Sequence, residues 1–442
     1  MAAEQLRCLV TGATGYIGGR LVPRLLDSGF AVRALARNPD KLAGVPWRDR
    51  IEVARGDLGD VASLEAAFDD VDIVYYLVHS MGFEKDFAAE ERRAALNVVT
   101  AARKAGVRRI VYLSGLHPEG TELSEHLGSR TTVGEILIAS GIETVVLQAG
   151  VVVGSGSASF EMIRHLTDRL PVMTTPKWVH NKIQPIAIRD VLHYLVAAAT
   201  CPVPESRTWD IGGPDVLEYG DMMQIYAEVA GLHPRRILVL PVLTPRIAAL
   251  WVGLVTPIPS GLARPLVESL HCDAVMGNHD IDTIIPPPEG GLTPYKRSVS
   301  LALARIARGD VETTWDTGTA ANLPSDPEWA GEVVYTDTRS QRSPAGPERL
   351  WTAVERNVPN RWRVAEREPG RVIKLHAEWR GFGDRWLEMR VFPEPDGSRY
   401  EQRSIFYPRG LLGRVYWYAA QPVHALLTDA RLRKVMSAVS PG

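Results

Sequence analysis

The sequence predicts an α/β protein with a doubly wound parallel sheet, followed by a smaller α+β domain built on an antiparallel sheet. Three observations carry this prediction. A glycine-rich turn separates an apolar run at residues 6–10 from a helical pattern that begins near Ile17. Strand-like and helix-like segments then alternate as far as residue 170, which is typical of parallel sheets with helical crossovers. Beyond residue 331 the apolar period becomes two, as in an antiparallel sheet with one solvated face.

Composition limits the classes of protein to which the chain can belong. Its 442 residues exceed one ordinary hydrophobic core and predict two or three domains. Hydrophobic residues make up 45% and charged residues 23%, as in soluble globular proteins. The net charge of −2 gives no indication of a nucleic-acid partner. Basic residues are in excess after residue 331, which marks either a partner surface or solvated strand faces.

Cysteine spacing and hydropathy bear on the compartment. Cys8, Cys201 and Cys272 lie far apart, which favours a reducing compartment and predicts no metal site. The first strand begins within ten residues, so we expect no signal peptide. The most apolar stretch, 237–258, holds three prolines and an arginine. We therefore expect a buried or lid helix there and no transmembrane segment, with peripheral membrane contact as the alternative. These features predict a cytoplasmic protein and leave its oligomeric state open.

Strand and helix patterns alternate through the N-terminal half of the chain. Apolar runs predict strands at Ala31–Ala36, Ile51–Ala54, Ile73–Val78, Arg109–Ser114 and Thr144–Val153. Helical periods predict helices at Ser63–Phe68, Ala88–Ala105 and Phe160–Leu170. Each helix lies between two strands, so we expect right-handed crossovers on both faces of one sheet.

The pattern changes along the chain predict the domain boundaries. Residues 1–308 are the predicted first domain, in which a substrate lobe occupies about 183–300. The lobe is expected to hold a strand at Ile183–Ile188, a helix from Asp190 and a strand at Thr208–Ile211. The polar stretch 309–330 is the predicted linker.

Residues 331–442 are the predicted second domain. Alternating apolar residues predict strands at Arg371–Trp379 and Trp386–Phe392, and Pro395–Gly397 predicts a turn. A helix is expected over Leu411–Val439, apart from Pro422.

The glycine-rich turn predicts a dinucleotide-binding site of the Rossmann type. Gly12 allows the tight exit from the strand, Gly15 lets a diphosphate approach the backbone, and Gly18 lets helix and strand pack closely. The diphosphate is expected at the helix N-terminus, where free amides point outward. The other predicted residues of this turn are Ala13, Thr14, Tyr16 and Ile17.

The residues after the second and third strands predict which dinucleotide binds. An NAD-preferring site places Asp or Glu at the end of the second strand, but here Ala36 is followed by Arg37. A guanidinium pairs with a 2′-phosphate, so we expect NADP(H) and less readily NAD(H). Asp57 and Leu58 are expected at the adenine edge. Leu77 and Val78, at the end of the fourth predicted strand, complete the cofactor site.

The motifs together resemble a known superfamily. The segment TGATGYIG, Arg37, the Gly-Asp-Leu turn, Asn97 and Leu113-Ser114-Gly115 are similar to short-chain dehydrogenases/reductases, closest to their atypical, NmrA-like branch. The resemblance covers roughly residues 5–300 and implies an NAD(P)-binding Rossmann domain. Phe406–Gly413 and Tyr416-Trp417-Tyr418 resemble an uncharacterised domain often fused to such proteins. That domain resembles the helix-grip fold, which holds apolar ligands elsewhere.

The chain departs from the superfamily at its proton donor. Active members carry Tyr-x-x-x-Lys after the fifth strand, but no Tyr or Lys occurs between Leu113 and Leu147. His126 and Arg130 have the same spacing and share a helix face if this segment is helical. His126 either donates the proton to the substrate or is a structural or substrate-orienting residue. Arg130 is expected to bind a charged substrate or the nicotinamide ribose. The other two candidate catalytic residues are Ser114, as an oxyanion-binding hydroxyl, and Asn97, which is alternatively a packing residue.

Three functions are compatible with these residues. The first is an NADP(H)-dependent oxidoreductase that reduces a small hydrophobic carbonyl, enone or imine with non-standard proton delivery. Trp178, Trp251, Pro241 and Pro245 favour an apolar substrate. The second is a non-catalytic NAD(P)(H)-binding sensor or scaffold, which the missing Tyr and Lys favour. The third is a redox-neutral isomerase or lyase that uses a bound cofactor.

Overall fold

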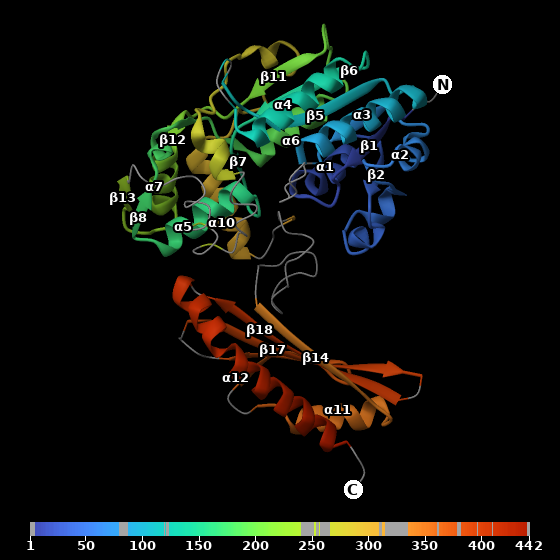
Figure 1. The fold of residues 1–442 in the computed structure, drawn as a ribbon, viewed down its shortest axis with the longest axis vertical. Helices are drawn as coiled ribbons and strands as arrows, with labels where there is room; N and C mark the ends of the chain where they lie inside the picture. Colours follow the sequence, from blue (N-terminus) through green and yellow to red (C-terminus); the bar gives the residue numbers. More distant parts are fainter. Residues whose placement is uncertain are drawn as a thin grey trace. The chain divides into compact units, whose positions relative to one another are not determined.

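The computed structural model divides the chain into two compact units, Met1–Gly318 and Thr319–Gly442 (Figure 1). The structure describes residues 5–78, 87–118, 120, 123–239, 252, 256, 266–308, 312–313, 335–359, 362–377, 382–395, 397–408 and 410–439. Of the predicted linker 309–330, only Glu312 and Thr313 are described. The other linker residues lie outside the described ranges, as do Trp251, Pro241, Pro245 and most of the apolar stretch 237–258.

The first unit is built on a seven-stranded, fully parallel sheet, which confirms the predicted fold class. The strand order is β11-β6-β5-β4-β1-β2-β3. The chain starts in the interior strand β1 and winds outward in both directions, so a crevice opens where the winding reverses. The strands are β1 (Arg7–Thr11), β2 (Ala31–Ala36), β3 (Glu52–Arg55), β4 (Ile73–Tyr76), β5 (Arg109–Gly115), β6 (Glu143–Ala149) and β11 (Arg207–Ile211).

Helices cover both faces of this sheet, and alternate strand residues supply the two cores. Cys8 and Val10 of β1 enter a core with Leu21 of α1 and Val191 of α6. Leu9, between them, enters the opposite core, with α2, α3 and α4. The helices of this layer structure are α1 (Tyr16–Asp27), α2 (Val61–Phe68), α3 (Phe87–Ala105), α4 (Glu125–Ile138) and α6 (Ile188–Ala197).

Two strand predictions need correction. The strand expected over Thr144–Val153 leaves the sheet at Gly150, where a Cβ atom would lie 2.9 Å from the Gln184 carbonyl oxygen. Its remainder, β7 (Val152–Val153), pairs instead with β10 (Ile186–Ala187) in a separate small sheet. The strand expected over Ile183–Ile188 is likewise divided, because its first part, β9 (Lys182–Ile183), pairs with β12 (Leu217–Glu218). Hydropathy is continuous across both breaks, so it could not reveal them.

A second hydrophobic cluster forms the lobe beside the sheet. Its core joins Phe160, Met173, Trp178 and Tyr219, and therefore begins earlier in the chain than the predicted lobe at 183–300. Its elements are α5 (Ala158–Arg169), β8 (Val172–Thr175), α7 (Tyr219–Val229), β13 (Arg236–Val239) and α10 (Tyr295–Arg308). Short 3-10 turns are η1 (Pro39–Leu42), η2 (Arg48–Arg50), η3 (Lys177–His180), η4 (Ser269–His271) and η5 (Asp280–Thr283).

The second unit is an antiparallel sheet with helices on one side, as predicted (Figure 1). Its order is β14-β18-β17-β16-β15, and Leu387 and Met389 of β17 face a core with Val354 and Val435. The helix expected over Leu411–Val439 forms, and it runs through Pro422. The elements are β14 (Tyr335–Ser343), α11 (Pro347–Arg356), β15 (Trp362–Glu368), β16 (Val372–Ala377), β17 (Gly383–Glu394), β18 (Gly397–Pro408) and α12 (Gly410–Ser437).

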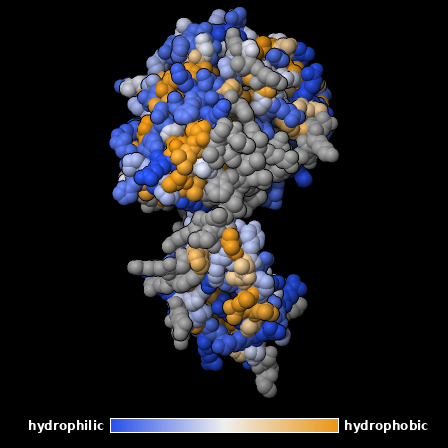
Figure 2. Space-filling view, turned by 60° about the vertical axis from the view of Figure 1, so that its left-hand side comes forward, coloured by the Kyte–Doolittle hydropathy of each residue, from blue (hydrophilic) through white to orange (hydrophobic). Residues whose placement is uncertain are grey.

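Surface hydropathy differs between the elements of the second unit. Figure 2 shows apolar side chains interrupting a largely hydrophilic surface. Helix α12 carries several of the most exposed large apolar side chains, which are 57–67% exposed: Val415, Tyr418, Val423, Leu426 and Leu427. Across the described ranges, no helix combines the length and hydropathy that crossing a bilayer requires.

Candidate active site and cofactor cleft

A cleft of about 1120 Å³ opens at the carboxyl ends of the parallel strands. This is the position at which open α/β sheets bind ligands. Most of the residues predicted from the sequence line it: Gly12, Thr14, Gly15, Tyr16, Ile17, Gly18, Arg37, Asp57, Leu58, Leu77, Val78, Ser114, His126 and Arg130. Ala13 and Asn97 are not among the lining residues.

The glycine-rich turn has the geometry that a diphosphate site requires. Gly12 adopts φ +72°, and its carbonyl accepts a hydrogen bond of 2.9 Å from the Gly15 amide. A Cβ atom on Gly18 would lie 2.2 Å from that same carbonyl oxygen, so only glycine fits there. Gly15 caps α1, and the first helical turn carries no acidic residue. Ala13 instead packs into the core beneath the turn.

The end of β2 is free of carboxylates. Ala36 is buried, and the exposed Arg37 follows it at the edge of the cleft. Neither the strand end nor the first turn of α1 therefore places a negative charge where a 2′-phosphate would bind.

The structure places Asn97 behind the adenine-edge turn. Its Nδ2 donates a 2.8 Å hydrogen bond to the Leu58 carbonyl, because this face of α3 packs against the loop after β3. The Asp57 carboxylate accepts from the Gly59 amide at 2.8 Å, which closes the same turn. Asn97 therefore shapes the loop on which Asp57 and Leu58 lie, and it does not reach the substrate side of the cleft.

Ser114, His126 and Arg130 come together from two elements. Ser114 is 4% exposed at the end of β5. Its hydroxyl interacts with the Tyr112 side chain, although it forms no hydrogen bond of standard geometry in the described part of the chain. Helix α4, capped by the Ser124 side chain, presents His126 and Arg130 one turn apart. The predicted shared helix face is thus present.

Burial sets the electrostatics of this pair. Desolvation, with a smaller contribution from Arg130, lowers the pKa of His126 to about 3. His126 is therefore a neutral imidazole near pH 7 and cannot act there as a cationic acid. Desolvation also lowers the pKa of Arg130, although the guanidinium stays charged because its ordinary value is so high. Among the described residues, the buried Arg130 Nε has no hydrogen-bond partner.

Glu91 is a cleft residue that the sequence analysis did not select. It lies on α3, is 5% exposed, and accepts a hydrogen bond from the Ser129 hydroxyl. Its negative charge favours the charged form of Arg130. Helical periodicity places Glu91 on the buried face of α3, but only the packing of α3 on α4 brings it to Arg130.

Comparisons with known proteins agree with this geometry. Residues 12–151 match the family described as NAD(P)H-binding, and residues 357–430 match a family described as a protein of unknown function (DUF2867). Over 230 residues the chain is 31% identical to the (4-alkanoyl-5-oxo-2,5-dihydrofuran-3-yl)methyl phosphate reductase of Streptomyces griseus subsp. griseus. That alignment spans 50% of this chain and 73% of the relative. The chain belongs to the NAD(P)H-binding reductases of the atypical short-chain dehydrogenase/reductase type.

One further relative and one solved structure are similar to this chain. It is 28% identical over 234 residues to the ceramide reductase of Caulobacter vibrioides, covering 52% of this chain and 72% of that relative. The triphenylmethane reductase of Citrobacter sp., solved with NADP(H), matches with a TM-score of 0.53 at 21% identity. That match covers 67% of this chain and all of the solved one, and it shows the shared fold.

The cleft of this reductase-family chain fits NAD(P)H by its own geometry. The Gly12–Gly18 turn has room for a diphosphate. The loop of Asp57 and Leu58 lies on one side of β1, and Ser114 lies on the other. A largely apolar wall from the lobe adjoins the site: Val151, Met162, Ile183, Tyr219, Leu266 and Leu270.

Proposed function

We propose that the N-terminal unit is an NADPH-dependent reductase of a small hydrophobic carbonyl, enone or imine. The observation that carries this proposal is a single cleft lined by both the dinucleotide turn and the apolar wall of the lobe. Two of the relatives are reductases whose named substrates differ in kind, so they support the reaction class more than any one substrate. The widely spaced, free cysteines fit a reducing compartment, and we propose that the protein acts in the cytoplasm.

Arg37 would select the cofactor by pairing with the 2′-phosphate of NADPH. The exposed guanidinium forms bidentate hydrogen bonds with such a group, and no carboxylate at the end of β2 opposes it. The nicotinamide, when bound, supplies hydride.

Ser114 and Arg130 would bind the substrate oxygen. Negative charge develops on that oxygen during reduction. Both side chains line the cleft, and the buried Arg130 Nε has no hydrogen-bond partner among the described residues. Arg130 stabilises the charge without releasing a proton, and His126, as a neutral imidazole, orients the substrate. Water would then protonate the oxygen in place of the usual Tyr and Lys, and the hydroxide that forms would leave the cleft to bulk solvent.

The test combines binding with turnover. We expect Arg37→Ala to weaken NADPH binding about tenfold or more and to leave NADH binding within twofold. The matched control is Arg92→Ala, an exposed arginine of α3 that does not line the cleft. NADPH oxidation is then followed with a panel of ketones, enones and imines, for the wild type and for Arg130→Met.

Each outcome of this test is decisive for one part of the proposal. Equal losses of NADPH and NADH affinity in Arg37→Ala would remove the phosphate assignment. Tight NADPH binding without turnover of any substrate would favour the second candidate, a non-catalytic NADP(H) sensor. That candidate draws on the absence of Tyr and Lys from 114–146.

A further inference from the structure

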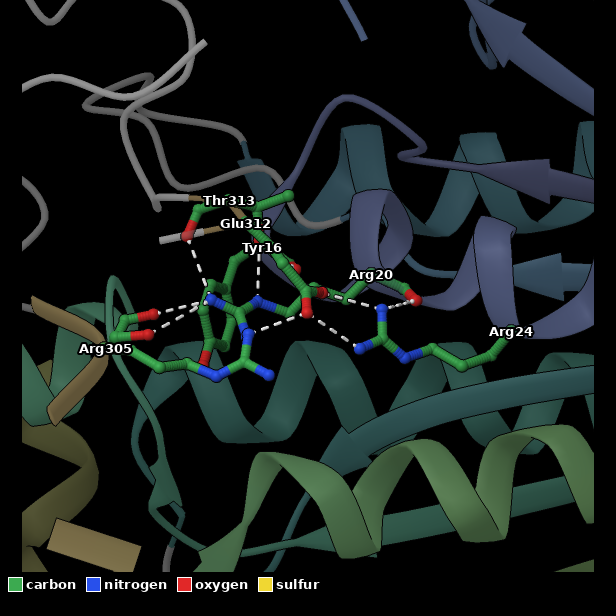
Figure 3. Close-up of polar contacts among 7 residues, drawn as sticks. Tyr16, Arg20, Arg24, Arg305, Glu312 and Thr313 are labelled. Atoms are coloured by element: carbon green, nitrogen blue, oxygen red, sulfur yellow. Dashed lines mark hydrogen bonds and ion pairs between the residues drawn. The ribbon is translucent and has the colours of Figure 1, made fainter. Parts of the chain in front are cut away.

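A buried arginine on the cofactor-binding helix joins three separate parts of the first unit. Arg20 of α1 is 3% exposed. Its Nε donates to the Thr313 hydroxyl at 2.8 Å, and its Nη2 donates to the carbonyls of Ser155 at 2.8 Å and Thr313 at 3.3 Å (Figure 3). Buried charges are costly unless they are hydrogen-bonded, so these contacts are needed for Arg20 to lie where it does.

Thr313 is in direct contact with the start of α1. Its hydroxyl donates a 2.9 Å hydrogen bond to the carbonyl of Tyr16, the first residue of the helix after the glycine-rich turn. A Cβ atom on Gly19 would lie 2.8 Å from the Thr313 methyl group, so Thr313 packs tightly on α1. Thr313 therefore restrains the helical turn whose amides face the diphosphate.

Glu312, the residue before Thr313, is held by ion pairs with two arginines. Arg24 donates two hydrogen bonds to its carboxylate, at 2.7 and 3.0 Å, and Arg305 of α10 donates one at 2.7 Å (Figure 3). Burial raises the pKa of Glu312, but the hydrogen bonds from the two arginines outweigh it, and the pKa falls to about 2. Glu312 is thus ionised at every physiological pH, so its ion pairs with Arg24 and Arg305 are kept over that whole range.

Ser155 extends the network to the far wall of the cleft. It lies in the loop 154–157, which is also held by a 3.0 Å hydrogen bond from the Gly156 amide to Glu161. Ser157 of this loop lines the cleft, as do the next two residues, Ala158 and Ser159. Arg20, Glu312 and Thr313 do not line it, so they act on the site only through the backbone that they hold.

We propose that Glu312 and Thr313 form a latch that, through the positioning residue Arg20, sets the geometry of both the diphosphate turn and the loop 154–157. The latch rests on the proposed function only where its test measures the binding of NADPH and NADH. Because the latch acts on the turn and not on the 2′-phosphate, it contributes equally to NADPH and NADH binding.

The test uses the full chain carrying Thr313→Val, which keeps the side-chain shape and removes both hydroxyl hydrogen bonds. We expect Kd for NADPH and for NADH to rise by the same factor, about tenfold, in fluorescence titrations. The matched control is Thr100→Val, an exposed threonine of α3 whose hydroxyl bonds only within its helix. Thr313→Ser, which retains the hydroxyl, should bind like the wild type.

A second measurement does not depend on cofactor binding. Amide hydrogen exchange of residues 12–20 and 154–157 in the cofactor-free protein should be faster in Thr313→Val and in Glu312→Gln than in the wild type. Unchanged exchange together with both Kd values within twofold of the wild type would overturn the latch. Failure of wild-type NADPH binding would instead overturn the proposed function and leave the exchange test valid. If Thr313→Val does not fold, Glu312→Gln decides the question by the same two readouts.

Discussion

At the scale of single residues, the unusual feature of this site is a histidine that is kept neutral. His126 and Arg130 have the four-residue spacing of the tyrosine and lysine that the resemblance implies. Packing beside Phe87, at 6.3 Å between ring centroids, leaves the imidazole 6% exposed. The four-residue spacing predicts that this pair shares one helix face, but no local pattern predicts the burial that lowers the pKa of His126.

The lowered pKa of His126 makes a prediction about acid stability. The folded protein resists protonating His126 down to about pH 3, whereas the unfolded chain takes up that proton near pH 6.5. Between these values the unfolded state binds more protons, so the free energy of unfolding falls as the pH falls. Between pH 7 and pH 4.5, we expect the free energy of unfolding to fall by about 2–3 kcal/mol less in His126→Gln than in the wild type. Chemical denaturation at a series of pH values measures this difference.

The control for this measurement is His233→Gln, an exposed histidine of the same unit. It should keep the wild-type dependence on pH. Parallel curves for His126→Gln and the wild type would show that His126 is not held neutral by burial.

At the scale of elements, the sequence predicted the sheet well where the chemistry is local. The strand Ala31–Ala36 has the predicted bounds, and the Gly12–Gly18 turn lies between β1 and α1 as expected. Prediction was wrong where pairing depends on distant segments, as at Gly150. The latch of Glu312 and Thr313 could not be predicted either. Thr313 and Tyr16 are separated by 297 residues, and no local pattern indicates such a contact.

The glycine-rich turn allows a matched test of element geometry. Gly18→Ala would bring a Cβ atom into the Gly12 carbonyl and should reopen the turn, weakening the binding of NADPH and NADH alike by about a hundredfold. Gly128 of α4 has open space around its Cβ position. Gly128→Ala should leave cofactor affinity unchanged and raise the free energy of unfolding by about 0.5–1 kcal/mol. Cofactor titrations and denaturation curves of the two variants measure both effects, and wild-type affinity in Gly18→Ala would refute the assigned turn geometry.

At the scale of the whole molecule, the two units have separate hydrophobic cores. The core around Leu387 and Val435 contains residues of the second unit alone, and the cores of the sheet and lobe contain residues of the first. The fold class, the family and the NAD(P)H-binding domain could all be predicted, because each has a motif or a period in the sequence. The proton source could not, since the Tyr-x-x-x-Lys motif is absent and no other motif between Leu113 and Leu147 marks a proton donor.

The central claim is that the cleft of the first unit brings hydride from NADPH to a hydrophobic substrate. The most direct measurement uses NADPH deuterated at the nicotinamide carbon that gives up hydride, with the panel of ketones, enones and imines, and mass spectrometry of the products. We expect a product that carries one deuterium, and a strong loss of this product in Arg130→Met. NADPH that binds tightly but transfers deuterium to no member of the panel would contradict it.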